Sequence, residues 1–391
     1  MDVFLVSAAR TAIGSFGGSL KDQKPGELAA LMAKAAIARA GIEAAQIGNV
    51  VLGMVIPCEP RDAYAARIAA MNAGIPQEVP AMTVNRLCGS GLQAIVSAAQ
   101  SIMLGDCDIA LGAGAEIMSR APYYLPAARW GQKMGDAALQ DGLTGALSDP
   151  FHAYHMGVTA ENVAARYGIS REDQDALAHE SQTRAAHAIA QGRFSDQIAP
   201  VEVMVKRKPV AFDTDEYVRM NAAPEDFAGL RPVFQKDGTV TAGNASGIND
   251  GAAAVVLASE AAVKAHNLKP LARLVAYGHA GVDPAYMGIG PVPATRNALQ
   301  RAGLSVADLD VIESNEAFAA QACAVARELA FDPAKVNPNG SGISLGHPVG
   351  ATGAIITTKL AYELQRTGGR YGLTTMCIGG GQGIAAIWER A

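Results

Sequence analysis

Apolar residues follow two alternating patterns along the chain. Residues 81–84 and 251–258 form short apolar runs that predict buried strands, while residues 92–103 carry apolar side chains at three- and four-residue spacing, which predicts a buried helix face. Residues 28–40 and 295–302 predict further helices, each followed by a glycine turn and an apolar strand. Because strands and helices alternate, the pattern predicts an α/β protein with mostly parallel sheets covered by helices.

The same order of elements occurs twice. Residues 39–42 (RAGI) match residues 301–304 (RAGL), and the glycines and serine near residues 89–91 are echoed at residues 340–342. Chance similarity of alanine-rich helices explains one such match, but two matches in the same order indicate two related α/β halves. In such sheets the active site lies at the carboxyl ends of strands, where loops of both halves can meet.

The region between the halves, residues 119–247, has a different composition. It begins with proline and aromatic residues at 122–130, contains a long polar helix at about 171–191, and is strongly charged near 206–216. Most of those charges are explained by a solvated surface, yet insertions of this size usually serve binding or assembly. We therefore predict three parts: an N-terminal half of residues 1–118 with 248–269, an inserted loop domain of residues 119–247, and a C-terminal half of residues 270–391.

Composition excludes several classes of protein. The 391 residues are 50% hydrophobic, include 42 glycines and carry a net charge of −5 without a dense basic run, so nucleic acid is a poor partner. We find no secretory signal and no apolar run approaching the roughly 18 residues of a membrane helix. The five cysteines are widely scattered and lack a CxxC pair, which predicts free thiols and a cytoplasmic location.

Cys88 is placed where the strand at residues 81–84 turns into the helix at residues 92–103. A thiol at a helix start faces unpaired N–H groups and the positive end of the helix dipole, which favour the nucleophilic thiolate by lowering its pKa. The alternative is that Cys88 is a small apolar core residue, where most free cysteines are found.

Three other reactive side chains also occupy the ends of elements. Asn315 follows an apolar strand, His347 precedes a helix, and Cys377 ends a strand before the glycines at 379–381. Taken singly, they are explained as a helix cap, a satisfied polar group and a core filler. Four such side chains at four element ends of a duplicated α/β protein favour a shared catalytic site.

The stretches that carry these residues resemble the four catalytic motifs of the thiolase family. They are residues 85–91 (NRLCGSG), 315–318 (NEAF), 346–348 (GHP) and 377–381 (CIGGG). Residues 9–14 and 155–161 fit the family too, so the resemblance runs from end to end. Among its members the chain is most similar to bacterial biosynthetic β-ketothiolases, including those of broad specificity. One departure is Ser314, where an apolar or small residue is expected before Asn315.

The resemblance implies the thiolase fold: two duplicated α/β halves in a layered α-β-α-β-α core, with an inserted loop domain. It also implies roles. Cys88 is the nucleophile that becomes acylated, His347 is its base, and Cys377 is the general acid/base that deprotonates Cα of acetyl-CoA. The N–H groups of Cys88 and Gly379 hold one oxyanion, and His347 with a water held by Asn315 holds the enolate oxygen.

Coenzyme A is recognised mainly by the insertion, according to the resemblance. The chain has neither a P-loop nor a Rossmann fingerprint. The family pattern places six residues near the acyl group, pantetheine or adenine: His155, Met156, Arg219, Ser246, Ala317 and Phe318. Without the resemblance, Arg219 is explained as an ordinary solvated charge. His152 and His155 lack a third ligand at metal spacing, so we predict no metal site.

Four alternative functions have to be distinguished from that of a biosynthetic β-ketothiolase. Residues 342–346 match GxSxG, which would make Ser344 the nucleophile of a hydrolase, but that motif needs a preceding strand and the approach here is a loop. A non-catalytic CoA-binding scaffold would be expected to lose catalytic side chains, and all four are present. A degradative 3-ketoacyl-CoA thiolase uses the same site, whereas ketoacyl synthases carry His or Asn where this chain has Cys377.

The sequence therefore predicts an acetyl-CoA C-acyltransferase that acts by a ping-pong mechanism. Its substrates are acyl-CoA thioesters of short to medium length, condensed with acetyl-CoA or released by thiolysis. Coenzyme A is a substrate and product, and no cofactor is tightly bound. The resemblance implies a homotetramer built from dimers, with residues 122–130 at the tetramer contact.

Overall fold

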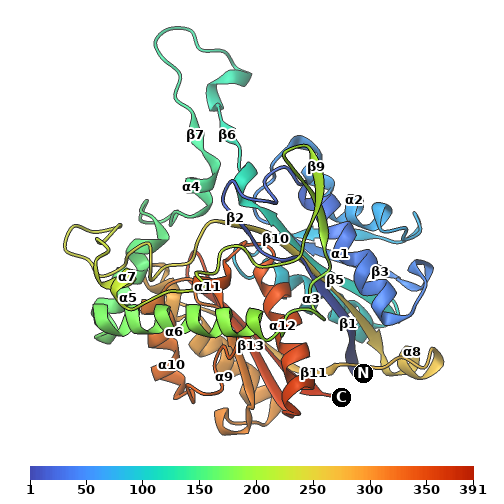
Figure 1. Ribbon diagram of the computed structural model, residues 1–391. Coiled ribbons are helices and arrows are strands. Elements are labelled where there is room, and N and C mark those ends of the chain that lie inside the picture. The colour runs from blue at the N-terminus through green and yellow to red at the C-terminus, as the bar shows by residue number, and fades with distance from the viewer.

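The computed structural model describes all residues, 1–391, and contains one large mixed sheet (Figure 1). Its strands are β1 (Val3–Arg10), β2 (Gly14–Ser15), β3 (Asn49–Gly53), β4 (Ala81–Val84), β5 (Ile109–Ile117), β10 (Asn249–Ser259), β11 (Ala272–Gly281), β12 (Val311–Ser314), β13 (Tyr371–Ile378) and β14 (Gln382–Arg390). They run in the order β12-β13-β14-β11-β1-β10-β5-β3-β4, and β2 pairs with β10 off this path.

Helices cover both faces of the sheet. They are α1 (Pro25–Ala40), α2 (Ala65–Asn72), α3 (Ser90–Leu104), α8 (Glu260–Ala265), α9 (Pro291–Ala302), α10 (Ala319–Leu329), α11 (Gly342–Leu345) and α12 (Thr352–Thr367). The 3₁₀ turns are η1 (Ala44–Gln46), η2 (Pro60–Tyr64), η3 (Met118–Arg120), η4 (Pro126–Arg129), η5 (Pro284–Ile289) and η6 (Val306–Asp308). α3 and α12 pack together between the two parts of the sheet, α1 and α2 lie against the N-terminal strands, and α9 packs on β11 and β14. The predicted layered core is confirmed.

The predicted duplication is visible in the order of the strands. The N-terminal order β4-β3-β5-β10-β1 is repeated as β12-β13-β14-β11, with the counterpart of β4 reduced to a single bridge between Val336 and Ile312. The matching helices α1 and α9 end at Gly41 and Gly303, whose φ values of 68° and 66° give the same left-handed cap. Glycine is favoured at this cap because a Cβ disfavours positive φ.

The expectation of mostly parallel sheets is wrong. Only β3–β4, β3–β5 and β12–β13 pair in parallel, and the remaining pairs are antiparallel. The reason is connectivity: β13 and β14 form a hairpin through the glycines at 379–381, and β10 returns from the insertion to lie between β1 and β5. The two parts also form one continuous sheet, because β1 and β11 share two residue pairs.

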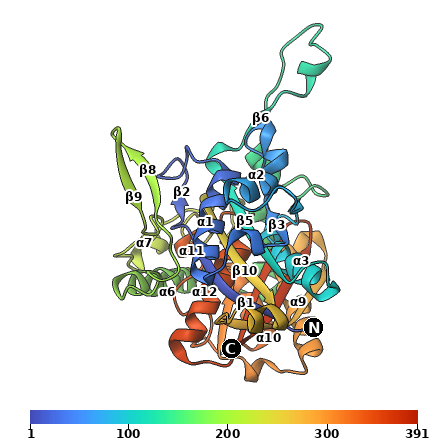
Figure 2. The same ribbon diagram turned by 90° about the vertical axis from the view of Figure 1, so that its right-hand side faces the viewer.

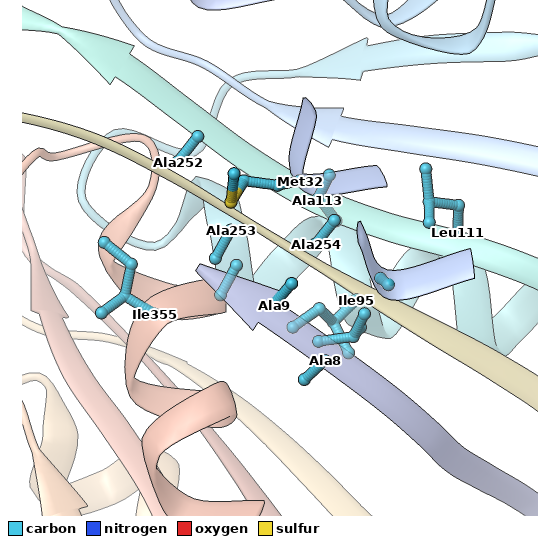
Figure 3. Packing of buried hydrophobic residues seen from close by; sticks show 14 of the residues in the cluster. Ala8, Ala9, Met32, Ile95, Leu111, Ala113, Ala252, Ala253, Ala254 and Ile355 are labelled. Carbon is cyan, nitrogen blue, oxygen red and sulfur yellow. The ribbon is translucent and has the colours of Figure 1, made fainter. Parts of the chain in front are cut away.

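Small side chains allow the helices to approach the strands closely. Ala8 and Ala9 of β1, residues 252–254 of β10 and Ala113 of β5 lie among the side chains of α1, α3 and α12 in Figure 3. A Cβ on Gly112 would lie 2.8 Å from the Cα of Ile95, so β5 needs glycine there. All of β10 is buried, which is why its sequence lacks the alternation of a half-exposed strand.

Two further expectations, a fully buried strand at residues 81–84 and the absence of any apolar run long enough to span a membrane, are corrected by the structure. β4 is only partly buried, with Met82 49% exposed, because it is the last strand of the sheet and pairs only with β3. An apolar window long enough for a membrane span does exist, at Leu87–Leu104, although 61% of it is buried. It contains the core helix α3, which packs on β3, β5 and α12.

The insertion begins with an arm that projects from the body, and a separate hairpin at residues 201–212 projects from another part of the surface (Figures 1 and 2). Its elements are β6 (Tyr123–Tyr124), β7 (Gln140–Asp141), α4 (Gly142–Ala146), α5 (Met156–Tyr167), α6 (Arg171–Ala190), β8 (Val201–Val205), β9 (Lys208–Phe212) and α7 (Glu225–Ala228). α6 confirms the predicted polar helix, and it packs on α10 and α11. Trp130 and Met134, in the arm, are each 88% exposed.

Candidate active site

Cys88 lies in a tight turn between β4 and α3, held by side chains on both sides of it. Asn85 Oδ1 accepts the Leu87 N–H at 2.9 Å, while Ser90 Oγ accepts the Arg86 N–H at 2.8 Å and donates to the Leu87 carbonyl at 2.6 Å. Leu87 has φ 46°, a left-handed conformation that is strained for a bulky residue. The strand-to-helix position predicted for Cys88 is confirmed.

The expected low pKa of Cys88 is wrong for the resting protein. Burial raises the pKa of the Cys88 thiol, and the N–H groups of Gly379 and of Cys88 itself, which donate to the sulfur, lower it by less. The helix start is therefore present, but the loss of solvent outweighs it. The same two N–H groups are those that the family pattern assigns to an oxyanion, and here they converge on one sulfur atom.

His347 is held in the loop before α12. Its backbone N–H donates to Asn249 Oδ1 at 3.0 Å, and its Nδ1 lies 2.6 Å from Thr352 Oγ1. The preceding Gly346, at φ 111°, packs so closely on Asn249 that a Cβ would come within 2.5 Å of it. Burial lowers the pKa of His347 to about 4, so the ring is neutral at pH 7 and can accept a proton.

Asn315 follows β12 and faces His347. Its Nδ2 lies 3.5 and 3.4 Å from the two ring nitrogens, and its buried Oδ1 has no hydrogen-bond partner in the structure. An unpaired buried amide oxygen is costly unless a water or a substrate group donates to it. The Glu316 side chain does not face His347. Its carboxylate accepts hydrogen bonds from Ser181 and Asn337 instead.

Ser314, the departure from the family pattern, is buried beneath Asn315. Asn337 bonds to its backbone on both sides, accepting from the Ser314 N–H at 2.9 Å and donating to its carbonyl at 2.8 Å. Ser341 Oγ donates to the same carbonyl at 3.3 Å. These contacts hold the main chain before Asn315 without using the Ser314 hydroxyl.

Cys377 ends β13 immediately before the turn to β14. Burial and the neighbouring Cys88 raise the pKa of its thiol. The turn needs glycine at 380 and 381, where φ is 78° and 84°. At Gly379 a Cβ would lie 3.0 Å from Met156 Cε, so a bare backbone leaves room for that side chain in the site.

One cavity of about 340 Å³ brings these residues together, and 17 of its 23 lining residues are hydrophobic. The predicted residues that line it are Cys88, His347, Cys377, Gly379, His155, Met156, Ser246, Ala317 and Phe318. Asn315 is not among the lining residues, although its amide reaches His347. An apolar cavity with a few convergent polar groups suits a small-molecule thioester.

Arg219 is the predicted CoA-binding residue that the structure does not bring to this cavity. It is exposed, it borders a separate hollow with His187, and its N–H donates to Gln182 Oε1 at 2.8 Å. Its assignment to adenine stays a prediction.

The sequence did not identify several lining residues. They include Leu87, Met118, Leu147, Tyr217, Phe234, Met287 and Val349. Phe234 stacks on His155 with ring centroids 4.7 Å apart and meets Phe318 edge-on. Because Phe234 lies in an irregular segment without periodicity, nothing local in the sequence indicates this contact.

The serine of the GxSxG match is in the wrong setting for a nucleophile. Ser344 is fully buried in α11, which follows a loop, and its hydroxyl lies 2.8 Å from Ser181 Oγ. It does not line the cavity. His152 and His155 likewise have separate partners: His152 contacts Asp149 at 2.9 Å, while His155 stacks on Phe234.

Comparisons with known proteins agree over the full length. Residues 3–261 match the thiolase N-terminal domain family and residues 268–390 match the thiolase C-terminal domain family. The chain is 66% identical to the beta-ketothiolase BktB of Cupriavidus necator, over 100% of this chain and 99% of that protein. It is 50% identical to an acetyl-CoA acetyltransferase of Syntrophomonas wolfei, over 99% of each chain.

Solved structures give the same result. The human mitochondrial 3-ketoacyl-CoA thiolase superposes with a TM-score of 0.98 at 47% identity, covering 100% of this chain and 99% of that one. The acetyl-CoA acetyltransferase of Bacillus anthracis does so with the same TM-score, identity and coverage. The sequence motifs, the duplicated fold and these matches over both halves show that the chain belongs to the thiolase family.

Proposed function

We propose that this chain is a β-ketothiolase that joins acetyl-CoA to a short or medium acyl-CoA, or cleaves the 3-ketoacyl product with CoA. The observation that supports this most directly is the convergence of Cys88, His347 and Cys377 in one apolar cavity, with two N–H groups on the Cys88 sulfur. The 66% identity to a beta-ketothiolase supports the same substrate class.

In the first half-reaction, Cys88 Sγ attacks the thioester carbonyl carbon and its proton passes to neutral His347. The N–H groups of Cys88 and Gly379 then stabilise the oxygen that gains charge. Since the pKa of Cys88 is raised and that of His347 lowered, the resting pair is thiol and imidazole. Proton transfer therefore accompanies attack, and His347 keeps the proton as the acyl-Cys88 thioester forms. CoA leaves as a thiolate, which then takes the thiol proton of Cys377 and leaves Cys377 as a thiolate.

In the second half-reaction, the Cys377 thiolate removes a proton from Cα of acetyl-CoA and becomes a thiol again. The resulting enolate oxygen accepts the Nε2–H of protonated His347 and a hydrogen of a water held by the Asn315 side chain. The enolate carbon attacks the acyl carbonyl, Cys88 leaves and takes its proton back from His347, and the 3-ketoacyl-CoA is released. His155, Met156, Ser246, Ala317 and Phe318, which line the cavity, are proposed to contact the acyl-pantetheine arm.

The direct test is intact-mass spectrometry after mixing the protein with an equimolar ladder of acyl-CoAs. We expect a covalent adduct whose mass identifies the preferred acyl group, with acetyl to about six-carbon chains favoured. Adding acetyl-CoA should then remove the adduct and release a 3-ketoacyl-CoA. No adduct with any acyl-CoA would contradict the proposal and favour a non-catalytic CoA-binding role.

The acylation step should depend little on pH between about pH 5 and pH 8. Because burial lowers the pKa of His347 to about 4, the base stays unprotonated down to that value, while the raised pKa of Cys88 keeps its proton at the alkaline side. An ordinary histidine with pKa near 6.5 would lose about 90% of its base form by pH 5.5. Rapid-quench measurement of acyl-Cys88 formation checks this, and a tenfold fall at pH 5.5 would contradict it.

We also propose a homotetramer built from dimers, with the projecting arm at the tetramer contact. Trp130 and Met134 present large apolar surfaces to solvent in the single chain, which favours an occupied interface. Replacing both with aspartate should reduce the solution mass from four chains to two by light scattering. Leu104→Asp, at an 80% exposed residue of α3, is the matched control, and an unchanged mass in the arm variant would contradict the proposal.

The three-part division predicted above is retained as a proposal, with the insertion at residues 119–247 carrying CoA contacts. It is supported by the return of β10 between β1 and β5 after the insertion. We further propose that the chain acts in the cytoplasm, since all five cysteines are free thiols. CoA serves as substrate and product in this scheme.

A further inference from the structure

Thr352, the first residue of α12, makes the shortest side-chain contact to the His347 ring, at Nδ1. Its Oγ1 lies 2.6 Å from His347 Nδ1 and 2.9 Å from the Pro348 carbonyl oxygen, and the residue is 2% exposed. A neutral imidazole carries its proton on one nitrogen only, so the partner of Nδ1 decides whether Nε2 is a base or a donor.

Two arrangements of hydrogens are conceivable, and the geometry separates them. If the Thr352 hydroxyl donates to Nδ1, its oxygen and the Pro348 oxygen face each other at 2.9 Å with no hydrogen between them. If it donates to the Pro348 oxygen, it is free to accept the Nδ1–H of His347, and both short contacts become hydrogen bonds. In a buried site the second arrangement is favoured because every polar group is satisfied.

We propose that Thr352 is a positioning residue that fixes His347 in the Nδ1–H tautomer, so that the lone pair of Nε2 is available for the proton of Cys88. This inference rests on the proposed thiolase reaction. The same Nδ1–H to Oγ1 bond remains when Nε2 takes the proton, and it then stabilises the imidazolium form. Thr352 touches no reacting atom and acts only through His347.

The test compares Thr352→Val with Thr352→Ser. Valine keeps the branched shape but lacks the hydroxyl, while serine keeps the hydroxyl. The fold should tolerate valine, because the Pro348 carbonyl retains the N–H groups of Ala351 and Thr352, each at 2.9 Å. We expect valine to slow acyl-Cys88 formation about 10- to 100-fold, the range for losing a hydrogen bond to an ionised group. The KM for acyl-CoA should stay within about twofold, and serine should stay within about threefold of wild type in rate.

A second readout does not depend on CoA chemistry. Alkylation of Cys88 by iodoacetamide, followed by peptide mass spectrometry, forms the carbon–sulfur bond, releases iodide and transfers the thiol proton to His347. We expect the valine variant to be alkylated about tenfold or more slowly at pH 7, as for His347→Gln, and the serine variant to match wild type.

The outcomes separate this inference from the proposed function. Wild-type rates of acylation and alkylation in the valine variant would overturn the role of Thr352. So would a serine variant as slow as valine, because the effect would then come from packing rather than from the hydroxyl. If wild type forms no acyl adduct while valine still slows alkylation, the proposed function fails and the positioning role stands.

Discussion

Replacing Cys88 with alanine is expected to abolish acyl-enzyme formation and to lower turnover by at least about 10⁴-fold, since a covalent mechanism has no substitute for its nucleophile. The fold should survive the change. Cys88 lies in a turn whose hydrogen bonds come from Asn85 and Ser90 and from the backbone, and alanine preserves all of them. Intact-mass spectrometry of the variant with acetyl-CoA measures the result directly.

The matched control is Cys323→Ala. Cys323 is another partly buried free thiol, but it lies on α10, borders a different hollow and is not part of the lining of the active-site cavity. It should acylate and turn over like wild type. An acyl adduct of unchanged amount on Cys88→Ala would place the nucleophile elsewhere, and peptide mapping would then identify the acylated residue.

The positions of the catalytic side chains could be predicted because they depend on local signals. Cys88, Asn315, His347 and Cys377 each occupy the end of an element, and apolar periodicity together with glycine turns marks such ends in the sequence. The resemblance added their roles. The cavity then brings together Cys88, His347 and Cys377 from both halves, as expected for loops at the carboxyl ends of strands.

Electrostatics and pairing could not be predicted in the same way. The helix start predicted a low pKa for Cys88, but burial raises that pKa instead. How deeply the sulfur is buried depends on residues distant in sequence, such as Gly379 and His347, that line the same cavity. The parallel sheets predicted from alternation were wrong because β13 and β14 form a hairpin and β10 lies antiparallel between β1 and β5. Neither fact is encoded within one window of sequence.

Long-range partners were also missed. Thr352 is five residues from His347 and looks like an ordinary helix start, while Phe234 reaches His155 from an irregular segment. Recognising either requires the fold. Arg219 shows the reverse case, since the family pattern assigns it to CoA whereas the single chain leaves its side chain exposed outside the cavity.

Replacing Cys377 with alanine should leave the first half-reaction, acylation of Cys88, intact and block the second, the condensation. The variant is expected to form acyl-Cys88 but to condense it at least about 10³-fold more slowly, because the positioned group that takes the Cα proton of acetyl-CoA is removed. His347 cannot serve as that base in our scheme, since it already carries the proton of Cys88 and donates to the enolate oxygen. The acyl-enzyme should therefore accumulate to nearly one equivalent.

Two measurements separate this loss from a general disturbance of the site. The first is intact mass, which should show full acylation. The second is exchange of the acetyl-CoA methyl protons in D₂O, which wild type should catalyse and the variant should not. Met376→Leu, a volume-conserving change at the neighbouring buried residue of β13, is the control and should retain both activities. Normal condensation by Cys377→Ala would show that another group deprotonates Cα, and loss of both half-reactions would show that Cys377 instead supports the acylation of Cys88.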